Sequence, residues 1–134
     1  MLKQGIRGRM EIRVTEEKTA RMMGSGELEV FATPAMIALT EETAWRSLRE
    51  YLEPGEGTVG TKVDLNHISA TPVGMMVVCE TETILIDRRR VVFHVEVRDE
   101  CGVIGEGTHE RFVVQNDKFM NKALEKKNRK ISEK

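Results

Sequence analysis

The chain has 134 residues, of which 40% are hydrophobic and 32% charged, and its formal net charge is -1. This length and balance are typical of one folded domain and exclude a wholly disordered chain. The near-neutral charge argues against a nucleic-acid-binding surface, and no apolar run is long enough to cross a membrane. Because the first seven residues lack the apolar run of a signal peptide, we expect a cytoplasmic protein.

The chain offers no pattern for a metal or redox site. Its two cysteines, Cys79 and Cys101, match no zinc or redox spacing, so we expect free thiols. His, Cys, Asp and Glu residues nowhere recur at the spacing of metal ligands. We therefore expect neither a metal nor a separate cofactor.

Periodicity predicts the elements in chain order. Residues 8–14 alternate and predict a half-buried strand, and a loop ending in Gly24-Ser25-Gly26 follows. An apolar stripe at helical spacing predicts a long helix from about Pro34 to Leu52, because Pro54 disfavours helix before it. The stripe consists of Ile37, Ala44, Trp45, Leu48 and Leu52. The period then changes to two and predicts four strands, at residues 58–67, 75–86, 90–98 and 103–114.

This order indicates an α+β fold, with one helix packed against a strongly bent antiparallel sheet. Residues 1–116 are expected to form a single domain. Residues 117–134 form a charged tail in which a few apolar residues predict a short helix that frays.

Thr33 lies where the long helix is expected to begin. Its hydroxyl suits an N-cap, with Pro34 in the first helical position. The alternative is a functional hydroxyl beside the positive end of the helix, which favours developing negative charge. The residue alone favours the cap.

Glu41 and His67 break the apolar patterns. Glu41 lies four residues after Ile37 and three before Ala44, on the predicted apolar stripe. His67 continues the inward positions 59, 61, 63 and 65 at the end of its strand. Each alone is more often a structural hydrogen-bonding group, but two such residues that converge indicate a functional site.

Two further residues are weaker candidates. Gly60 lies in a strand, on the face opposite the apolar residues, and a strand glycine often marks a close backbone approach. Arg111 shares a face with His109 and suits a carboxylate or phosphate, although exposure is the simpler expectation. His94 alternates outward and is expected at the surface.

Several motifs together carry a resemblance to a known family. They are Phe31-Ala32-Thr33-Pro34, Glu41-Glu42, residues 58–67 (Thr-Val-Gly-Thr-Lys-Val-Asp-Leu-Asn-His), Thr71-Pro72-Val73-Gly74 and residues 105–112 (Gly-Glu-Gly-Thr-His-Glu-Arg-Phe). Over residues 8–114 the chain resembles the fluoroacetyl-CoA thioesterases, a branch of the hotdog-fold thioesterases.

The resemblance implies a hotdog fold, in which a curved antiparallel sheet wraps one long helix. It assigns catalytic roles to Thr33, Glu41 and His67. Gly60 would support the thioester carbonyl or the catalytic water, and Arg111 would lie near the acyl pocket. It also implies a homodimer paired edge to edge into one continuous sheet, with acyl-CoA near the interface and coenzyme A only as part of the substrate.

The expected function is therefore hydrolysis of a small acyl-CoA thioester to free acid and CoA. The family's fluoroacetyl enzyme closes an aromatic lid over the acyl group, whereas Ala20–Glu27 contains no aromatic residue here, so the general activity is the safer expectation. His67 would be the general base, Glu41 would orient it or attack the thioester, and Thr33 would be the nucleophile or position a water. Two alternatives are a non-catalytic acyl-CoA or small-molecule binding module and a hotdog acyl-CoA hydratase or dehydratase.

Overall fold

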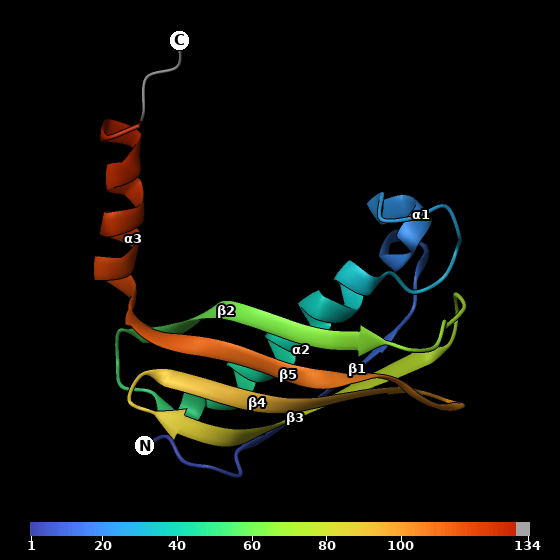
Figure 1. The fold of residues 1–134 in the computed structure, drawn as a ribbon, viewed down its shortest axis with the longest axis horizontal. Coiled ribbons are helices and arrows are strands. Elements are labelled where there is room, and N and C mark those ends of the chain that lie inside the picture. The colour runs from blue at the N-terminus through green and yellow to red at the C-terminus, as the bar shows by residue number, and fades with distance from the viewer. Residues whose placement is uncertain (131–134) are drawn as a thin grey trace.

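A computed structural model describes residues 1–130, in which a curved antiparallel sheet wraps around one long helix (Figure 1). The sheet has five strands in the order β1-β3-β4-β5-β2, so β1 and β2 form its two edges. The helices are α1 (Ala20–Met23), α2 (Thr33–Leu48) and α3 (Asn116–Glu125), and the strands are β1 (Arg7–Arg13), β2 (Glu56–His67), β3 (Met76–Asp87), β4 (Arg90–Asp99) and β5 (Gly102–Gln115).

The predicted α+β layout and the order of its elements are confirmed. Every predicted strand is present, with its ends within two residues of the expected positions. The turn between β3 and β4 is tight enough to hold Arg88 at a φ of 60°, a backbone conformation that favours glycine. β4 places Val91, Phe93, Val95 and Val97 against the helix, all fully buried, because alternate side chains point to the same face of a strand.

Helix α2 packs mainly over β1 and β3. Its fully buried positions include Met36, Ala44 and Leu48, and Gly105 of β5 leaves room for the Met36 sulfur. The buried face is rotated from the predicted stripe, since Ile37 and Trp45 are only half-buried. The helix also ends at Leu48, before the predicted Leu52, and a short 3₁₀ helix (Arg49–Tyr51) follows it.

A β-bulge in β2 changes which of its side chains face the helix. The pairing of β2 with β5 shifts between Gly60 and Lys62, so Gly60 lies opposite Arg111 and Val63 lies opposite His109. Directly opposed residues point to the same side of a sheet, and both β5 residues are buried. Gly60 therefore shares the inward face with Val63, which corrects the prediction that it lies on the opposite face.

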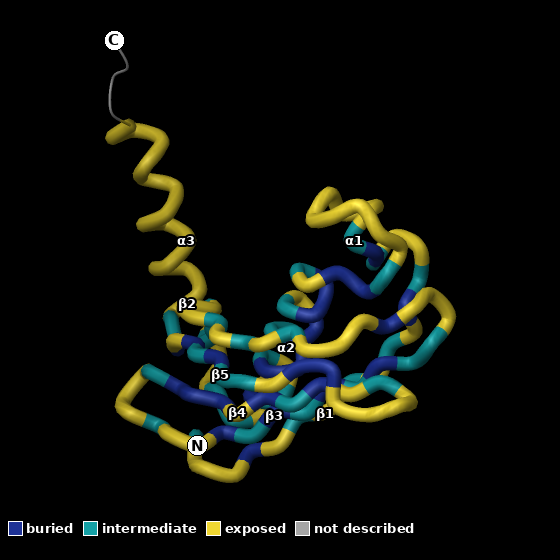
Figure 2. The backbone as a smooth tube through the Cα atoms, turned by 45° about the vertical axis from the view of Figure 1, so that its right-hand side comes forward, coloured by how far each residue is buried: buried dark blue, intermediate teal, exposed yellow. Residues whose placement is uncertain are grey.

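Helices α1 and α3 lie at opposite ends of the molecule, and both rise past the β2 edge in two views (Figures 1 and 2). All of α3 is exposed (Figure 2). It confirms the short helix predicted in the tail, while residues 131–134 of that tail lie outside the described part. No helix within residues 1–130 is long and apolar enough to span a membrane.

Candidate active site

The hydroxyl of Thr33 is free of the capping role that its position predicted. The N-cap of α2 is Ala32, whose extended backbone (φ -76°, ψ 142°) enters the helix without a side-chain hydrogen bond. Thr33 is the first helical residue and Pro34 the second. The predicted cap was therefore one residue too late, and the Thr33 side chain points elsewhere.

The Thr33 hydroxyl meets the imidazole of His67. Thr33 Oγ1 lies 2.7 Å from His67 Nδ1, although the two residues are 34 positions apart. The start of α2 supplies one group, and the end of β2 supplies the other. Phe31 packs edge-on against the His67 ring, with 6.4 Å between ring centroids, and so restricts its orientation. This hydroxyl–imidazole pair has the geometry of a nucleophile and its base.

Burial favours the neutral form of His67. Desolvation lowers the pKa of His67 below its ordinary 6.5, because the charged form loses water, and the backbone at Ser69 offsets part of this shift. The His67 Nε2 atom is buried, and within residues 1–130 it has no hydrogen-bond partner. A neutral imidazole with one unpaired nitrogen can accept a proton or contact a bound ligand.

A hollow of about 300 Å³ opens beside this pair. Thr33, His67 and Phe31 line it, together with Ala20, Val30 and Ile68. Thr33 brings the N-terminal end of α2 to the wall of this hollow, and a helix N-terminus favours a developing negative charge. The hollow therefore has a candidate reacting pair and a helix N-terminus in one place.

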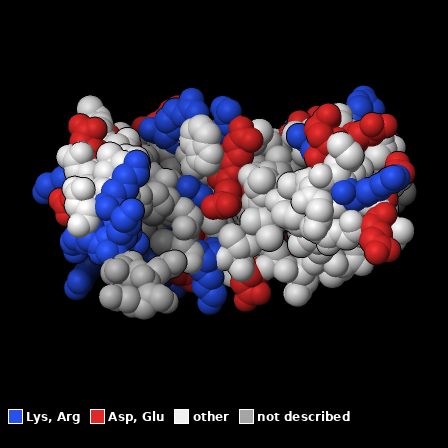
Figure 3. Space-filling view, turned by 90° about the horizontal axis from the view of Figure 1, so that it is seen from above, with Lys and Arg blue, Asp and Glu red and all other residues white. Residues whose placement is uncertain are grey.

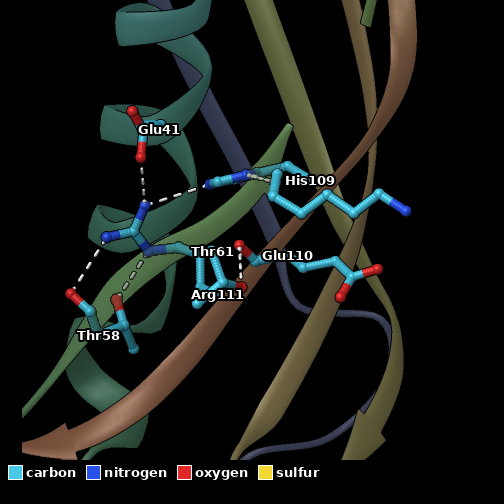
Figure 4. Close-up of polar contacts among 7 residues, drawn as sticks. Glu41, Thr58, Thr61, His109, Glu110 and Arg111 are labelled. Atoms are coloured by element: carbon cyan, nitrogen blue, oxygen red, sulfur yellow. Dashed lines mark hydrogen bonds and ion pairs between the residues drawn. The ribbon is translucent and has the colours of Figure 1, made fainter. Parts of the chain in front are cut away.

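A second cluster surrounds Arg111, farther along the same sheet (Figure 4). Arg111 is only 5% exposed, which corrects the expectation of a surface residue. Its Nη1 donates to Glu41 Oε2 at 3.3 Å, its Nε donates to Thr58 Oγ1 at 2.9 Å, and its Nη2 donates to the Thr58 carbonyl at 3.1 Å. Burial lowers the pKa of Arg111, and the Glu41 carboxylate partly offsets this effect. The Arg111 guanidinium is thus held by hydrogen bonds to Glu41 and Thr58, which fix its position.

His109 completes this cluster, although sequence reasoning noted only that it shares a face with Arg111. Its Nδ1 lies 2.7 Å from the Lys62 carbonyl, which can only accept, so Nδ1 carries the proton. Its Nε2 then accepts a hydrogen bond from Arg111 at 3.2 Å. Burial lowers the pKa of His109, and the neighbouring Arg111 charge adds to that effect. His109 therefore acts as a neutral acceptor that positions the guanidinium.

Gly60 lies directly against Glu41. A Cβ atom at position 60 would collide with Glu41 Oε2 and come within 3.2 Å of Arg111 Nη1. The absence of a side chain therefore lets the carboxylate approach the β2 backbone. The structure thus brings together three of the residues singled out from the sequence, Gly60, Glu41 and Arg111.

The two clusters are separate within one chain. Glu41 lies eight residues after Thr33 along α2, which corresponds to roughly 12 Å. Gly60 and His67 lie seven residues apart on β2, which corresponds to roughly 20 Å. Glu41 pairs with Arg111, so it does not orient the His67 of its own chain.

Other expectations can also be compared with the structure. His94 is exposed on the outer face, as predicted. Cys79 is buried and Cys101 exposed, and both are free thiols. Among residues 1–130, no three His, Cys, Asp or Glu side chains lie close enough together to hold a metal ion.

Comparison with known proteins identifies the family. A family model described as fluoroacetyl-CoA-specific thioesterase matches residues 14–117. The fluoroacetyl-CoA thioesterase of Streptantibioticus cattleyicolor is 42% identical over 98 residues, which are 73% of this chain and 70% of that protein. This chain belongs to the fluoroacetyl-CoA thioesterase family. The resemblance stated from the sequence motifs is therefore confirmed, and so is the expectation of an acyl-CoA thioesterase.

Solved structures of relatives confirm the hotdog fold. A crystal structure of a fluoroacetyl-CoA thioesterase matches with a TM-score of 0.88 and 37% identity, covering 94% of this chain and 98% of that one. A Thermus thermophilus protein of the thioesterase superfamily matches with a TM-score of 0.89 and 27% identity, covering 96% of both chains. The match thus extends over nearly the whole length of that fluoroacetyl-CoA thioesterase structure.

Proposed function

We propose that the protein hydrolyses a short acyl-CoA thioester to the free acid and CoA, with Thr33 and His67 as the reacting pair. The observation that carries this proposal is the 2.7 Å contact between Thr33 Oγ1 and His67 Nδ1 beside an open hollow. Membership of the fluoroacetyl-CoA thioesterase family indicates thioester hydrolysis as the class of reaction. The Thr33 hydroxyl and the His67 imidazole suit the roles of nucleophile and general base in that reaction.

In the simplest route, His67 takes the Thr33 proton while the hydroxyl oxygen attacks the thioester carbonyl carbon. The carbon–sulfur bond then breaks, and His67 returns the proton to the CoA sulfur. Water, activated by the same imidazole, hydrolyses the acyl-threonine ester. The free N–H groups of the first turn of α2 stabilise the oxyanion in both steps. In a second route, Thr33 and His67 position a water that attacks directly.

Glu41 enters this site through a second subunit. Among residues 1–130 no strand pairs with the outer edge of β2, and an exposed strand edge can pair with an identical strand. Two β2 strands paired antiparallel, about a twofold axis near Val63 and Asp64, bring His67 beside Gly60 of the partner subunit. Glu41 of the partner subunit then lies near His67 and can orient it or stabilise its charged form.

The Arg111 cluster suits the acyl end of the substrate. Arg111 and Gly60 lie side by side on the inward face, next to a hollow of about 380 Å³ that Trp45, Leu52 and Thr58 also line. A buried guanidinium favours a small polar or electronegative acyl group over a long alkyl chain. The α1 segment (residues 20–28) exposes Met22 and Leu28 and carries no aromatic residue, so the proposal stops at a short acyl group and does not extend to fluoroacetyl selectivity.

A non-catalytic binding module would keep the hollows but release no thiol. A hydratase or dehydratase would need an Asp/His pair of the kind those hotdog enzymes use, and the present pair is Thr33 with His67. Of the three functions, hydrolysis is the one that uses both the Thr33 hydroxyl and the His67 imidazole.

The test is an activity panel on the purified protein. Release of free CoA thiol from acetyl-CoA and other short acyl-CoAs is followed with a thiol reagent, alongside crotonyl-CoA hydration as the rival activity. We expect thiol release that Thr33→Ala strongly reduces. Substrate binding without thiol release would support the binding module, and hydration without hydrolysis would support the hydratase; either result would overturn the proposal.

A further inference from the structure

Helix α3 carries an apolar stripe that the other residues of 1–130 leave uncovered. Phe119 is 41% exposed, Met120 53% and Leu124 49%, and Ala123 continues the same side at helical spacing. Such a stripe on a surface helix normally faces a packing partner. Within residues 1–130, α3 packs mainly against the end of β5 and the short 3₁₀ helix (Lys126–Asn128) that follows it.

The position of α3 relative to β2 indicates which partner it meets. The Asn116 backbone N–H donates to the Gly55 carbonyl at 2.9 Å, so α3 starts level with the beginning of β2. From there it rises past the β2 edge, beyond which the described part of the chain has no further strand (Figures 1 and 2). It therefore projects into the space that a second subunit paired along β2 would occupy.

Antiparallel pairing of the two β2 strands then determines which part of the second subunit lies next to α3. The beginning of one β2 lies beside the end of the other, where the partner's Thr33–His67 hollow opens. Ile68 lines that hollow and is 58% exposed. The α1 segment reaches the hollow through Ala20 and Ser25, and it exposes Met22 (65%) and Leu28 (69%). We call Ile68, Met22 and Leu28 the rim. The apolar stripe and the apolar rim would thus lie at the same level of the paired strands.

The charges around α3 and around α1 are also complementary. Residues 117–130 contain six basic and two acidic residues, whereas residues 16–29 around α1 contain four glutamates and two basic residues. Seen from above, Lys and Arg side chains gather over the end of the molecule that carries α3 (Figure 3). Opposite potentials on the two ends favour their approach in an antiparallel dimer and disfavour a parallel one.

We propose that α3 of each subunit docks on the rim of the other subunit's Thr33–His67 hollow, so that a second copy of the chain covers this hollow. The inference rests on the edge-paired dimer of the proposed function. It extends that proposal by giving α3 a partner and by making the cover of each hollow an intersubunit contact.

The test is a double-mutant cycle on the dimer dissociation constant, measured by sedimentation equilibrium with the full chain. The helix variant is Phe119→Ser with Leu124→Ser, and the rim variant is Leu28→Ser with Ile68→Ser. We expect each to raise the dissociation constant at least about tenfold. If the helix and the rim touch, the two effects should not multiply fully, because each variant already removes the same contact. The increase in the dissociation constant of the combined variant should therefore be at least about threefold smaller than the product of the two separate increases. Asn121→Ser, an exposed polar change on α3, is the matched control and should leave it unchanged.

An unchanged dissociation constant in the helix variant, or effects that multiply fully, would overturn the inference. A chain that is monomeric without any substitution would overturn it too, whatever its thiol-release activity. Conversely, a dimer with the expected coupling but no thiol release from any acyl-CoA would uphold the docking and refute the hydrolase. The two proposals therefore fail by different measurements.

Discussion

Thr33 Oγ1 and His67 Nδ1 lie 2.7 Å apart, and the long helix that carries Thr33 begins one residue earlier than the sequence predicts. With Ala32 as the N-cap, the threonine hydroxyl is not used to hold the helix end. A side chain that stabilises its own helix would have to give up that bond to react. Here the hydroxyl is already engaged with the imidazole that would take its proton.

Removal of the imidazole tests the base directly. We expect His67→Ala to lower kcat for a short acyl-CoA at least about a hundredfold, the usual contribution of general acid–base catalysis. The matched control is His94→Ala, which removes an exposed histidine on the outer face of β4. Steady-state thiol release measures both, and equal rates in the two variants would contradict the role of His67.

Substitutions of Thr33 separate chemistry from helix capping. Thr33→Ser keeps a hydroxyl and should retain much of the activity, whereas Thr33→Val keeps the shape without the hydroxyl and should lose most of it. Because Thr33 makes no capping bond, Thr33→Val should lose only its hydrogen bond to His67. In a His67→Ala background, where that bond is already absent, Thr33→Val should barely change the free energy of unfolding, whereas loss of a cap costs about 1 kcal/mol. Urea unfolding measures the difference, and a cap-sized loss would restore the structural explanation.

The pH profile follows from the direction of the His67 shift. Burial lowers the pKa of this imidazole below 6.5, so the basic form persists to lower pH than in an exposed histidine. In a Glu41→Gln variant, where no partner carboxylate can oppose this shift, we expect kcat/KM to change little as pH falls from 8 toward 6.5 and to decline mainly below 6.5. A decline that begins clearly above pH 7 would contradict a neutral, desolvated base.

The close approach at Gly60 predicts a coupled pair of substitutions. Gly60→Ala should destabilise the protein and lower activity, because its Cβ would meet Glu41 Oε2. In a Glu41→Ala background the same change should cost less, since the colliding group is gone. Denaturant unfolding of the two single variants and the double variant measures this coupling. Equal costs in both backgrounds would show that Glu41 does not limit the space at position 60.

Arg111 is expected to be important for stability as well as for substrate binding. Arg111→Met would leave His109 Nε2 and the Thr58 carbonyl without their donor, at a cost of about 1–3 kcal/mol for buried groups of this kind. Arg7→Met is the control, because the Arg7 side chain is 80% exposed and its ion pair with Glu82 is long at 3.6 Å. Surface pairs contribute about 0–1 kcal/mol. Similar unfolding free energies for the two variants would contradict the network.

Local patterns predicted most of the fold. Alternation and helical spacing are properties of neighbouring residues, so the strand positions and the long helix could be predicted without tertiary information. The rotation of α2 could not, because Ile37 and Trp45 are apolar but only half-buried, while Thr40 and Thr43 are fully buried beside the sheet. Which side of an amphipathic helix is covered depends on the surface it meets.

The site was harder to predict because its contacts span long distances in sequence. Arg111 was expected at the surface, but its partner Glu41 lies 70 positions away, and no local pattern reports such a pairing. His67 was placed on the inward face by alternation, and the structure agrees because no irregularity separates it from Val63. The catalytic roles of Thr33, Glu41 and His67 stay predictions until the substitutions are measured.

The bulge after Gly60 has a further consequence for how this protein tolerates change. Gly60 and His67 are seven residues apart, so regular alternation would place them on opposite faces of β2. The extra residue at the bulge, Thr61, places both on the same face. Replacing its side chain would cost at most the exposed hydrogen bond from Thr61 Oγ1 to the Glu110 carbonyl, whereas deleting the residue would reverse the facing of every residue on one side of it. The facing of Gly60 and His67 therefore depends on the number of residues in β2 as well as on which residues they are.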